Sequence, residues 1–378
     1  MKICFWGNNT GALKGNTDGG GELQLALLAK ALVRGGNEVV IIDYQATEDF
    51  ISPDGIKVFS IKGWNNGIRF IRVFTHRLPL LYKSLKAQKA DIYYCRMRDF
   101  RHILSFWAAR KVKAKFIIGL ASDLDAMNFG KRWKYNYIVS KFGLWALSSN
   151  LLIEIIYPFL LRKADLVLAQ HRGQKIMLSK KNIDSFLFPN LFDHPETPFI
   201  PPQAKKDFIY VGRLDKRKGF STFFEIIKKS PMHTFKVVGH PYDKTGFLYY
   251  EKLKKFPNVT LMGKLTHPDT MRYIANSKAL ISTSPMEGFP NVFLEAWSCG
   301  IPVLSLYIDP GDIIKIEKLG NVTNGNCDML LLAMESVDNS TEFANRAMTY
   351  IENNHALNAK KIEEISSLFR KLLNNRDK

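Results

Sequence analysis

The feature of this chain that most constrains its fold is a regular alternation of short apolar segments with amphipathic ones. Ile3–Trp6 is an apolar run typical of a buried strand, and residues 23–34 carry apolar side chains at helical spacing before two glycines. The same alternation predicts four further strands in the first half, at Glu38–Tyr44, Asp91–Cys95, Lys115–Leu120 and Asp165–Ala169. Strands that alternate with helices in this way predict a doubly wound parallel sheet, and therefore the α/β class.

A Pro-rich segment at residues 189–202 interrupts the pattern, and a second alternation follows it. Its expected strands are Asp207–Val211, Thr234–Val238, Val259–Met262, Ala279–Ser282 and Pro302–Ser305. We expect a Rossmann-like domain at 1–190, a linker at 191–205, a second Rossmann-like domain at 206–340, and a helical tail at 341–378 that packs back toward the first domain. Two such domains face each other across a central cleft, where ligands bind at the carboxyl ends of the strands.

The cysteines and the apolar segments bear on the cellular compartment. Cys4, Cys95, Cys299 and Cys327 lie far apart, a spacing that predicts neither a disulfide scaffold nor a zinc site. The first residues are typical of a strand rather than of a signal peptide. Residues 142–161 form the longest apolar stretch, but polar residues and a proline interrupt it, so a buried helix pair is expected there rather than a membrane span. The sequence thus predicts a cytoplasmic protein.

Positive charge is concentrated in the first half of the chain. Residues 1–190 hold 29 Lys and Arg against 14 Asp and Glu, a net charge of +15, whereas residues 191–378 hold 25 against 21, a net charge of +4. A field confined to one domain predicts an anionic partner on that side, such as phospholipid, a diphosphate-bearing molecule or nucleic acid.

The segment from residue 284 to 302, SPMEGFPNVFLEAWSCGIP, carries the most specific pattern. Glu287 and Glu295 are separated by seven residues, and the segment lies between an expected strand and an expected helix. Gly288 and its neighbours would therefore lie at a helix N-terminus, where free amides favour an anionic ligand. Glu295 follows on that helix, where a carboxylate is suited to the two hydroxyls of a ribose.

A pair of cations follows another expected strand of the same half. Arg213 and Lys218 occur in the segment VGRLDKRKG, which leads into a helix. An arginine fork and a lysine point charge are both suited to a diphosphate, and they would stabilise the negative charge that develops when a nucleoside diphosphate departs.

Together these residues resemble glycosyltransferase family 4, whose members have the GT-B fold of two facing Rossmann-like domains. The resemblance covers GRLDKRKG, FKVVGH, VTLMGKL and EGFPNVFLEAWSCGIPVLS, and is looser in the first half. It implies an acceptor site in the first domain and a donor site in the second. It also implies a retaining transfer of a hexose from a UDP- or GDP-sugar to a glycan or lipid-linked hydroxyl, without a metal ion or other cofactor.

The resemblance also implies residue roles. Arg213 and Lys218 would hold the donor diphosphate, Glu287 the donor hexose and Glu295 the ribose. The remaining donor-side residues that it implies are Gly212, Gly239, Gly263, Lys264, Leu265, Gly288, Phe289, Pro290, Asn291 and Val292.

In the first half, Gly19, Gly20 and Gly21 match the family's glycine-rich loop near the acceptor and the diphosphate, because glycines permit close backbone approach. The absence of G-x-G-x-x-G argues against a dehydrogenase cofactor site. Where many relatives carry a histidine, this chain has Ser122 and Asp123, whose role stays open. Asp123 and Asp125 also spell the D-x-D metal motif of the unrelated GT-A fold, a reading that the context opposes.

The basic, aromatic segment at residues 64–89 has two readings. It could be an amphipathic helix that docks on anionic lipid, or an ordinary helix that packs on the sheet. We expect a peripheral enzyme at the inner face of the cytoplasmic membrane, with a lipid-linked or otherwise anionic acceptor, in surface polysaccharide or glycolipid synthesis, and no nucleic-acid partner. The alternatives are a GT-B-like sugar-nucleotide epimerase and a non-catalytic membrane-binding adaptor.

Overall fold

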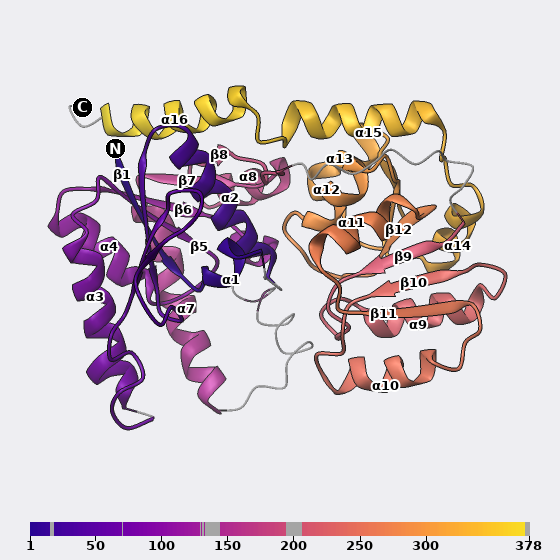
Figure 1. The fold of residues 1–378 in the computed structure, drawn as a ribbon, viewed down its shortest axis with the longest axis horizontal. Coiled ribbons are helices and arrows are strands. Elements are labelled where there is room, and N and C mark those ends of the chain that lie inside the picture. Colours follow the sequence, from indigo (N-terminus) through magenta and orange to yellow (C-terminus); the bar gives the residue numbers. More distant parts are fainter. Residues whose placement is uncertain are drawn as a thin grey trace.

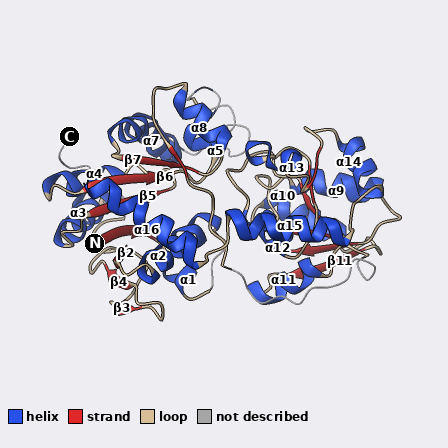
Figure 2. Ribbon diagram, turned by 90° about the horizontal axis from the view of Figure 1, so that it is seen from above, coloured by secondary structure: helices blue, strands red, loops and turns tan. Residues whose placement is uncertain are grey.

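The computed structural model describes residues 1–15, 19–69, 71–128, 130, 132, 144–193 and 206–374. Figure 1 shows two α/β lobes side by side, with two helices lying across the top of both. Figure 2 shows from above that each lobe has a central sheet with helices on its two faces.

The first lobe is built on an eight-stranded sheet with the order β3-β4-β2-β1-β5-β6-β7-β8. All its strand pairs are parallel except β3 with β4. Its strands are β1 (Lys2–Gly7), β2 (Glu38–Asp43), β3 (Phe50–Ile51), β4 (Lys57–Ser60), β5 (Ile92–Arg96), β6 (Lys115–Gly119), β7 (Leu166–Ala169) and β8 (Phe186–Leu187).

The helices of the first lobe cover the two faces of its sheet. They are α1 (Thr10–Leu13), α2 (Gly20–Arg34), the π-helical turn η1 (Val73–Arg77), α3 (Leu78–Ala87), α4 (His102–Lys111), α5 (Asp123–Ala126), α7 (Leu144–Lys163) and α8 (Arg172–Ser179).

The second lobe is built on a six-stranded parallel sheet with the order β11-β10-β9-β12-β13-β14. Its strands are β9 (Phe208–Val211), β10 (Phe235–Val238), β11 (Val259–Gly263), β12 (Ala279–Ser282), β13 (Val303–Ser305) and β14 (Gly320–Val322). This is the order of a dinucleotide-binding fold, and the order of the strands reverses between β9 and β12.

The helices of the second lobe alternate with these strands. They are α9 (Phe220–Lys229), α10 (Lys244–Leu253), α11 (His267–Ala275), α12 (Asn291–Ser298), the 3-10 turn η3 (Pro310–Asp312), α13 (Ile313–Ile316) and α14 (Cys327–Glu335).

The strands form where the sequence has continuous apolar runs, because a parallel sheet covered by helices buries both of its faces. Val39 to Asp43 are all buried in β2, as are Ile92 to Arg96 in β5. The ten expected strands are therefore confirmed, but β3, β4, β8 and β14 were not expected. Strands β3 and β8 have two residues each and β14 has one apolar residue, which is too little to show a pattern in the sequence, whereas β4 is as long as β9 and β10 and was missed.

The C-terminal segment forms two helices that belong to different lobes. In α15 (Thr341–Asn354), Phe343, Ala347 and Ile351 pack into the core of the second lobe. In α16 (Ala359–Asn374), Ile365 and Phe369 pack with α2 in the core of the first lobe. The chain therefore crosses back between the lobes near residue 355, as Figure 1 shows. Most of the expected linker, residues 194–205, lies outside the described residues.

One expectation is wrong. In place of a buried helix pair over residues 142–161, α7 is a single helix that continues through Pro158. Its apolar residues Leu151, Leu152, Ile155 and Phe159 are exposed, by 53%, 41%, 65% and 43%. Apolar composition predicted burial, but α7 lies on the outside of the helical layer, where only one of its faces can be covered.

The crossing point is held by a buried histidine. His355 Nδ1 donates to the backbone oxygen of Asn190 at 2.7 Å, and Nε2 accepts from the hydroxyl of Tyr350 at 3.2 Å. Burial lowers the pKa of His355 to about 4, because the ring has no water to solvate a charge.

We expect His355 to make stability depend on pH between about 6.5 and 4. Below about pH 6.5 the unfolded chain binds a proton at His355 and the folded chain does not. As the pH is lowered toward 4, the free energy of unfolding should therefore decrease by up to about 3 kcal/mol. Urea denaturation of wild type and His355→Gln at pH 7 and pH 5 measures this contribution. The variant should lose less stability between the two pH values than wild type and than His233→Gln, which alters a histidine paired with Glu335. Equal losses in all three proteins would contradict it.

Candidate functional site

A pocket lies at the carboxyl ends of β9 and β12, where the strand order of the second sheet reverses. Crevices at such a position bind ligands in doubly wound folds. The lining residues come from β9 and the loop after it, from the end of β12, and from the loop that leads into α12: Tyr210, Val211, Lys218, Ile281, Ser282, Thr283, Ser284, Glu287, Pro290 and Val292.

Two charged side chains meet in this pocket. Lys218 Nζ lies 2.5 Å from Glu287 Oε1, and both side chains are partly exposed, by 31% and 20%. Lys218 immediately precedes α9, and Glu287 lies shortly before α12, so the structure brings together two predicted residues that are 69 positions apart. An ion pair at this exposure contributes little to stability, which leaves both groups able to exchange partners with a ligand.

Arg213 lies on the same β9–α9 loop. Its NH2 group is 3.2 Å from Asp215 Oδ2, and its guanidinium lies 4.5 Å from the ring centre of Tyr242. Asp215 is 2% exposed, and its other oxygen accepts the backbone N–H of Lys218 at 2.8 Å. Asp215 therefore anchors the loop that carries both Arg213 and Lys218.

The approach of this loop to β12 requires a glycine. Gly219 has φ +66° at the start of α9, and a β carbon there would overlap the backbone oxygen of Thr283. The hydroxyl of Thr283 donates to the backbone oxygens of Lys218 and Gly219, at 3.1 and 3.0 Å. No side chain caps α9 or α12, so the N-termini of two helices border the pocket with their positive dipole ends.

Glu295 lies on α12 but does not line the pocket. It is 9% exposed, and its Oε1 lies 3.4 Å from His267 Nε2 at the start of α11. The hydrogen bond to Glu295 raises the pKa of His267. The structure therefore gives Glu295 a protein partner that the sequence did not suggest.

Three predicted glycines follow or end neighbouring strands. Gly212, Gly239 and Gly263 stand at the carboxyl ends of β9, β10 and β11, and the N–H of Gly239 donates to the oxygen of Gly263 at 2.8 Å. Lys264 is exposed and Leu265 packs on the second lobe's core. These residues at the strand ends form a rim, and the rim adjoins the pocket at Val211, which lines the pocket and precedes Gly212.

The first lobe directly contacts residues 287–291, which lead into α12 and are called the pocket loop below. The N–H of Asp123 donates to the backbone oxygen of Glu287 at 3.2 Å. A β carbon on Gly288 would overlap Gln170 Oε1 and would crowd the backbone of Ala121 and Ser122, so only glycine fits between the lobes here. The main chain at Glu287 and Gly288 is thus held against the first lobe.

Ser122 and Asp123 have separate tasks. The Ser122 hydroxyl accepts the N–H of Leu124 and caps α5, while Asp125 accepts the N–H groups of Ala121 and Ser122. Asp123 Oδ1 instead accepts from His171 Nε2 at 2.9 Å and Gln174 Nε2 at 3.0 Å.

The two carboxylates of the D-x-D sequence therefore serve different protein partners. In the described part of the chain, no group of three or more His, Cys, Asp or Glu side chains could hold a metal ion.

The glycine-rich loop also meets the pocket loop. Gly19 precedes α2, and the backbone oxygen of Gly20 accepts from Asn291 Nδ2 at 3.2 Å. Gly21 lies against the sulfur of Met97. Phe289, between Gly288 and Pro290, is 5% exposed and contacts His355 and Trp297.

A buried network of side-chain amides joins the lobes, and the sequence did not predict it. Gln24 Nε2 donates to Asn291 Oδ1 at 3.1 Å, and Asn190 Nδ2 donates to Asn291 Oδ1 and to the oxygen of Phe289. Gln170 and Arg96 in turn donate to Asn190 Oδ1. Gln24 could have indicated this network in the sequence, because it is a polar residue on the apolar face of an expected helix.

Along the described residues, no helix is both long enough and apolar enough to cross a membrane.

Solved structures with the same architecture identify the fold. Sucrose-phosphate synthase from Thermosynechococcus elongatus aligns with a TM-score of 0.73 and 16% identity, over 99% of this chain and 100% of that chain. Anabaena HepE in complex with UDP and glucose aligns with a TM-score of 0.68 and 15% identity, over 99% of both chains. The lipopolysaccharide outer core galactosyltransferase WaaB aligns with a TM-score of 0.65 and 22% identity, over 98% and 100%. The fold is the GT-B fold of glycosyltransferases, which confirms the predicted fold class.

The family comparison concerns the second half. Residues 196–354 match the family model of group 1 glycosyl transferases. A 41.2 kDa uncharacterized protein in the cps region of Klebsiella pneumoniae is 29% identical over 105 residues, 27% of this chain and 28% of that protein. The uncharacterized glycosyltransferase MJ1059 of Methanocaldococcus jannaschii is 25% identical over 197 residues, 44% of this chain and 48% of that protein. Each match thus spans less than half of the relative.

Gly288→Ala should force the lobes apart, because the added β carbon would overlap Gln170 and crowd the first domain's backbone. Overpacking of this kind costs roughly 1–3 kcal/mol, and separation of the lobes relieves it. Small-angle X-ray scattering should give a larger radius of gyration than for wild type. Gly130→Ala is the control, since a β carbon there meets nothing within 4 Å. An unchanged radius for Gly288→Ala would show that the lobes do not pack as described.

Proposed function

We propose that this chain is a retaining glycosyltransferase that transfers a hexose from a nucleoside-diphosphate sugar to a hydroxyl of a glycan or lipid-linked acceptor. The observation that carries the proposal is the Lys218–Glu287 pair in the pocket between β9 and β12, with Arg213 on the same loop and two helix N-termini beside it. This combination suits a ligand that has both phosphate and hydroxyl groups.

The donor diphosphate would bind Lys218, Arg213 and the open amides of α9 and α12. Binding would draw Lys218 Nζ from Glu287, and the released carboxylate would accept hydrogen bonds from hexose hydroxyls. When the bond between the sugar's anomeric carbon and the diphosphate oxygen breaks, negative charge develops on the phosphate. The two cations stabilise that charge and lower the barrier.

Retention follows in this proposal from a same-face transfer. The acceptor oxygen forms its bond to the anomeric carbon on the face that the diphosphate leaves, and the acceptor proton passes to the departing phosphate oxygen. Neither a protein nucleophile nor a metal ion takes part, because cationic side chains and helix N-termini supply the positive charge. The resemblance to family 4 supports this course.

We propose UDP or GDP as the nucleotide. Glu295 would bind the ribose hydroxyls after release from His267, and the rim at Gly263, Lys264 and Leu265 would contact the base. The presence of UDP and glucose in the Anabaena HepE structure, which has the same fold, supports a uridine nucleotide.

The first domain would bind the acceptor, with Gly19, Gly20, Gly21, Ser122 and Asp123 along its edge of the cleft. Its charge of +15 favours an anionic acceptor or surface. A role in surface polysaccharide or glycolipid synthesis is supported by WaaB, a lipopolysaccharide galactosyltransferase of this fold, and by the relative in a cps region.

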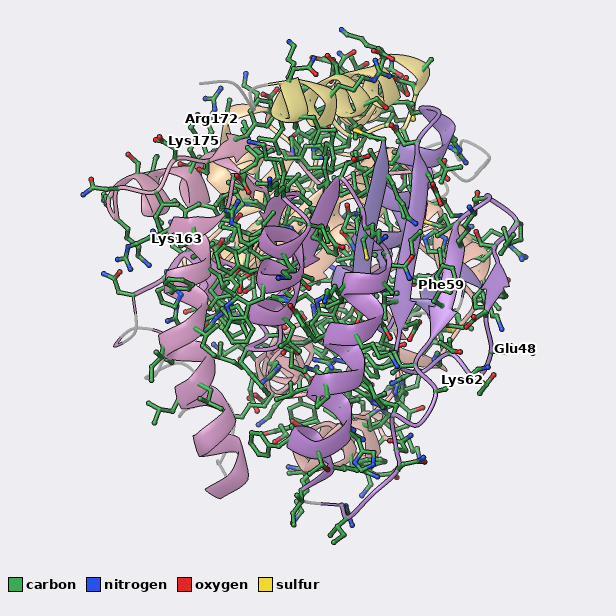
Figure 3. The ribbon with its side chains drawn as sticks, turned by 90° about the vertical axis from the view of Figure 1, so that its left-hand side faces the viewer. Glu48, Phe59, Lys62, Lys163, Arg172 and Lys175 are labelled. Atoms are coloured by element: carbon green, nitrogen blue, oxygen red, sulfur yellow. The ribbon has the colours of Figure 1, made fainter. Side chains whose placement is uncertain are left out.

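We also propose peripheral contact with the inner face of the cytoplasmic membrane. Figure 3 shows the outer face of the first lobe, where α3, α4 and α7 lie side by side and Lys163 ends α7. Along α3, Leu81 and Leu85 pack on the sheet, so α3 is an ordinary domain helix. Exposed apolar side chains lie instead on α7, on α4 at Trp107, and just before α3 at Ile68, Ile71 and Phe74.

Glu287→Ala should lower turnover by roughly 100-fold or more while the fold stays intact, because the lost contacts act in the transition state. Arg213→Ala and Lys218→Ala should weaken nucleoside-diphosphate binding in calorimetry. The assay first screens UDP- and GDP-sugars for hydrolysis or thermal stabilisation, and then includes excess chelator, which should leave activity unchanged. Lys216→Ala, on the same loop, is the control. Undiminished turnover in Glu287→Ala would refute its role with the donor hexose. Activity that requires added manganese would refute a transfer without a metal ion.

Liposome flotation tests the membrane contact. The protein should float with anionic vesicles at low salt, and less with neutral vesicles or at high salt, since each nearby Lys or Arg contributes roughly 1 kcal/mol. Ile155→Asp should weaken binding to the vesicles roughly tenfold, because it removes about one apolar side chain that would otherwise be buried in the lipid. Leu332→Asp, equally exposed but in the second domain, should float like wild type. A protein that stays unbound with anionic vesicles at low salt would favour a soluble acceptor.

A further inference from the structure

Three arginines gather beside an aromatic cluster at the carboxyl edge of the first sheet. Trp6 lies near the end of β1, Tyr44 directly follows β2, and Trp64 follows β4. The rings of Tyr44 and Trp64 stack with centroids 5.3 Å apart and an interplanar angle of 25°. The arginines are Arg72, Arg77 and Arg101.

Two of the guanidinium groups, those of Arg77 and Arg101, lie on these rings. Arg101 is 4.9 Å from the ring centre of Trp6 and 5.4 Å from that of Tyr44. Arg77 is 5.3 Å from the ring centre of Trp64, and its Nε donates to the backbone oxygen of Trp64. Cation–π contacts and the bond to the main chain hold both forks in place before any ligand arrives.

Carboxylates do not balance this charge. Asp99 occupies the fork of Arg101, whose Nε lies 2.9 Å from Oδ1 and whose NH2 group lies 2.5 Å from Oδ2, so Arg101 adds charge to the cluster while Arg72 and Arg77 keep forks that no carboxylate of the described residues occupies. Arg72 and Arg77 bind Asn65 instead, and neither has an ion pair with a carboxylate among the described residues. The pKa of Arg77 is lowered by burial and then by the nearby charges of Arg72 and Arg101. Asp43, like Asp99, lies close enough to raise the pKa of Tyr44, so three guanidinium groups face two carboxylates and leave a local excess of one positive charge.

A buried donor in the cluster also lacks a partner. Trp6 is 4% exposed, and its Nε1 has no hydrogen-bond acceptor among the residues that the structure describes. A buried N–H that forms no bond is costly in a folded protein, and a ligand that accepts one would relieve that cost. The excess of positive charge favours an anion, and an anionic oxygen is also an acceptor of the kind that the indole N–H lacks.

A chain of contacts connects this cluster to the donor pocket. Asn291 of the pocket loop binds Gly20, Gly21 lies against Met97, and the oxygen of Met97 contacts His102 Nε2 at 2.9 Å, next to Arg101. These contacts therefore link the arginine–aromatic cluster to the glycine-rich loop within the first lobe.

We propose that Arg72, Arg77 and Arg101, with Tyr44 and Trp64, form a binding site for a phosphate or carboxylate group of the acceptor. Arginine forks bind both groups in a bidentate manner, and aromatic walls suit the sugar or prenyl part beside the anion. That the ligand is the acceptor rests on the proposed function; that the cluster binds an anion does not.

Calorimetry can test anion binding without any turnover. The protein used carries Arg213→Ala and Lys218→Ala, so that the donor pocket no longer competes for diphosphate. Geranyl diphosphate probes a lipid-linked phosphate, a glucuronate-containing tetrasaccharide probes a sugar carboxylate, and uncharged geraniol is the control ligand. At least one anionic probe should bind and geraniol should not, and the tighter of the two identifies the source of the anion.

In that protein, Arg77→Gln should weaken the anionic probe roughly tenfold or more, and Arg77→Lys, which keeps the charge but not the fork, by less. Lys83→Gln removes the same charge from an exposed position on α3 and should bind like the parent. Thermal melts check that each variant folds. Failure of both anionic probes to bind, or equal affinity in Arg77→Gln and Lys83→Gln, would overturn the proposal. Intact anion binding in a protein that hydrolyses no sugar nucleotide would instead count against the proposed function alone.

Discussion

The structure depends on the backbone contact between the loop at residues 287–291 and the first domain. One hydrogen bond, from the N–H of Asp123 to the oxygen of Glu287, joins the lobes at the residue whose carboxylate holds Lys218. The absence of a side chain at Gly288 permits that approach. The first domain therefore helps to position the Lys218–Glu287 pair of the second domain. Separation of the lobes would alter the pocket that this pair lines.

Much of this arrangement could be predicted from the sequence, because strand order and strand ends constrain each other. Arg213 and Glu287 were found from their places after apolar runs, and parallel strands put the residues that follow them at one edge of the sheet. Strands β3, β8 and β14 were missed because two residues, or a single apolar residue in β14, carry too little pattern.

What the sequence could not predict arises from tertiary contacts. Nothing local pairs Gln24 or Asn190 with Asn291, since these residues are 101 to 267 positions apart. The partner of Glu295, His267, is likewise set by the packing of α11 on α12. For α7, apolar composition led to the wrong prediction of a buried helix pair, because the helix is covered on one face only and Leu151, Leu152, Ile155 and Phe159 are exposed.

The return of α16 to the first lobe has a consequence for synthesis. Ile365 and Phe369 complete a core that otherwise consists of residues from the first half of the chain. On the ribosome, the first domain must wait for residues 359–374 while the whole second domain emerges and folds between them. During that interval the apolar face of α2 is uncovered, so a nascent chain of this architecture is exposed to aggregation and is a natural client for a chaperone.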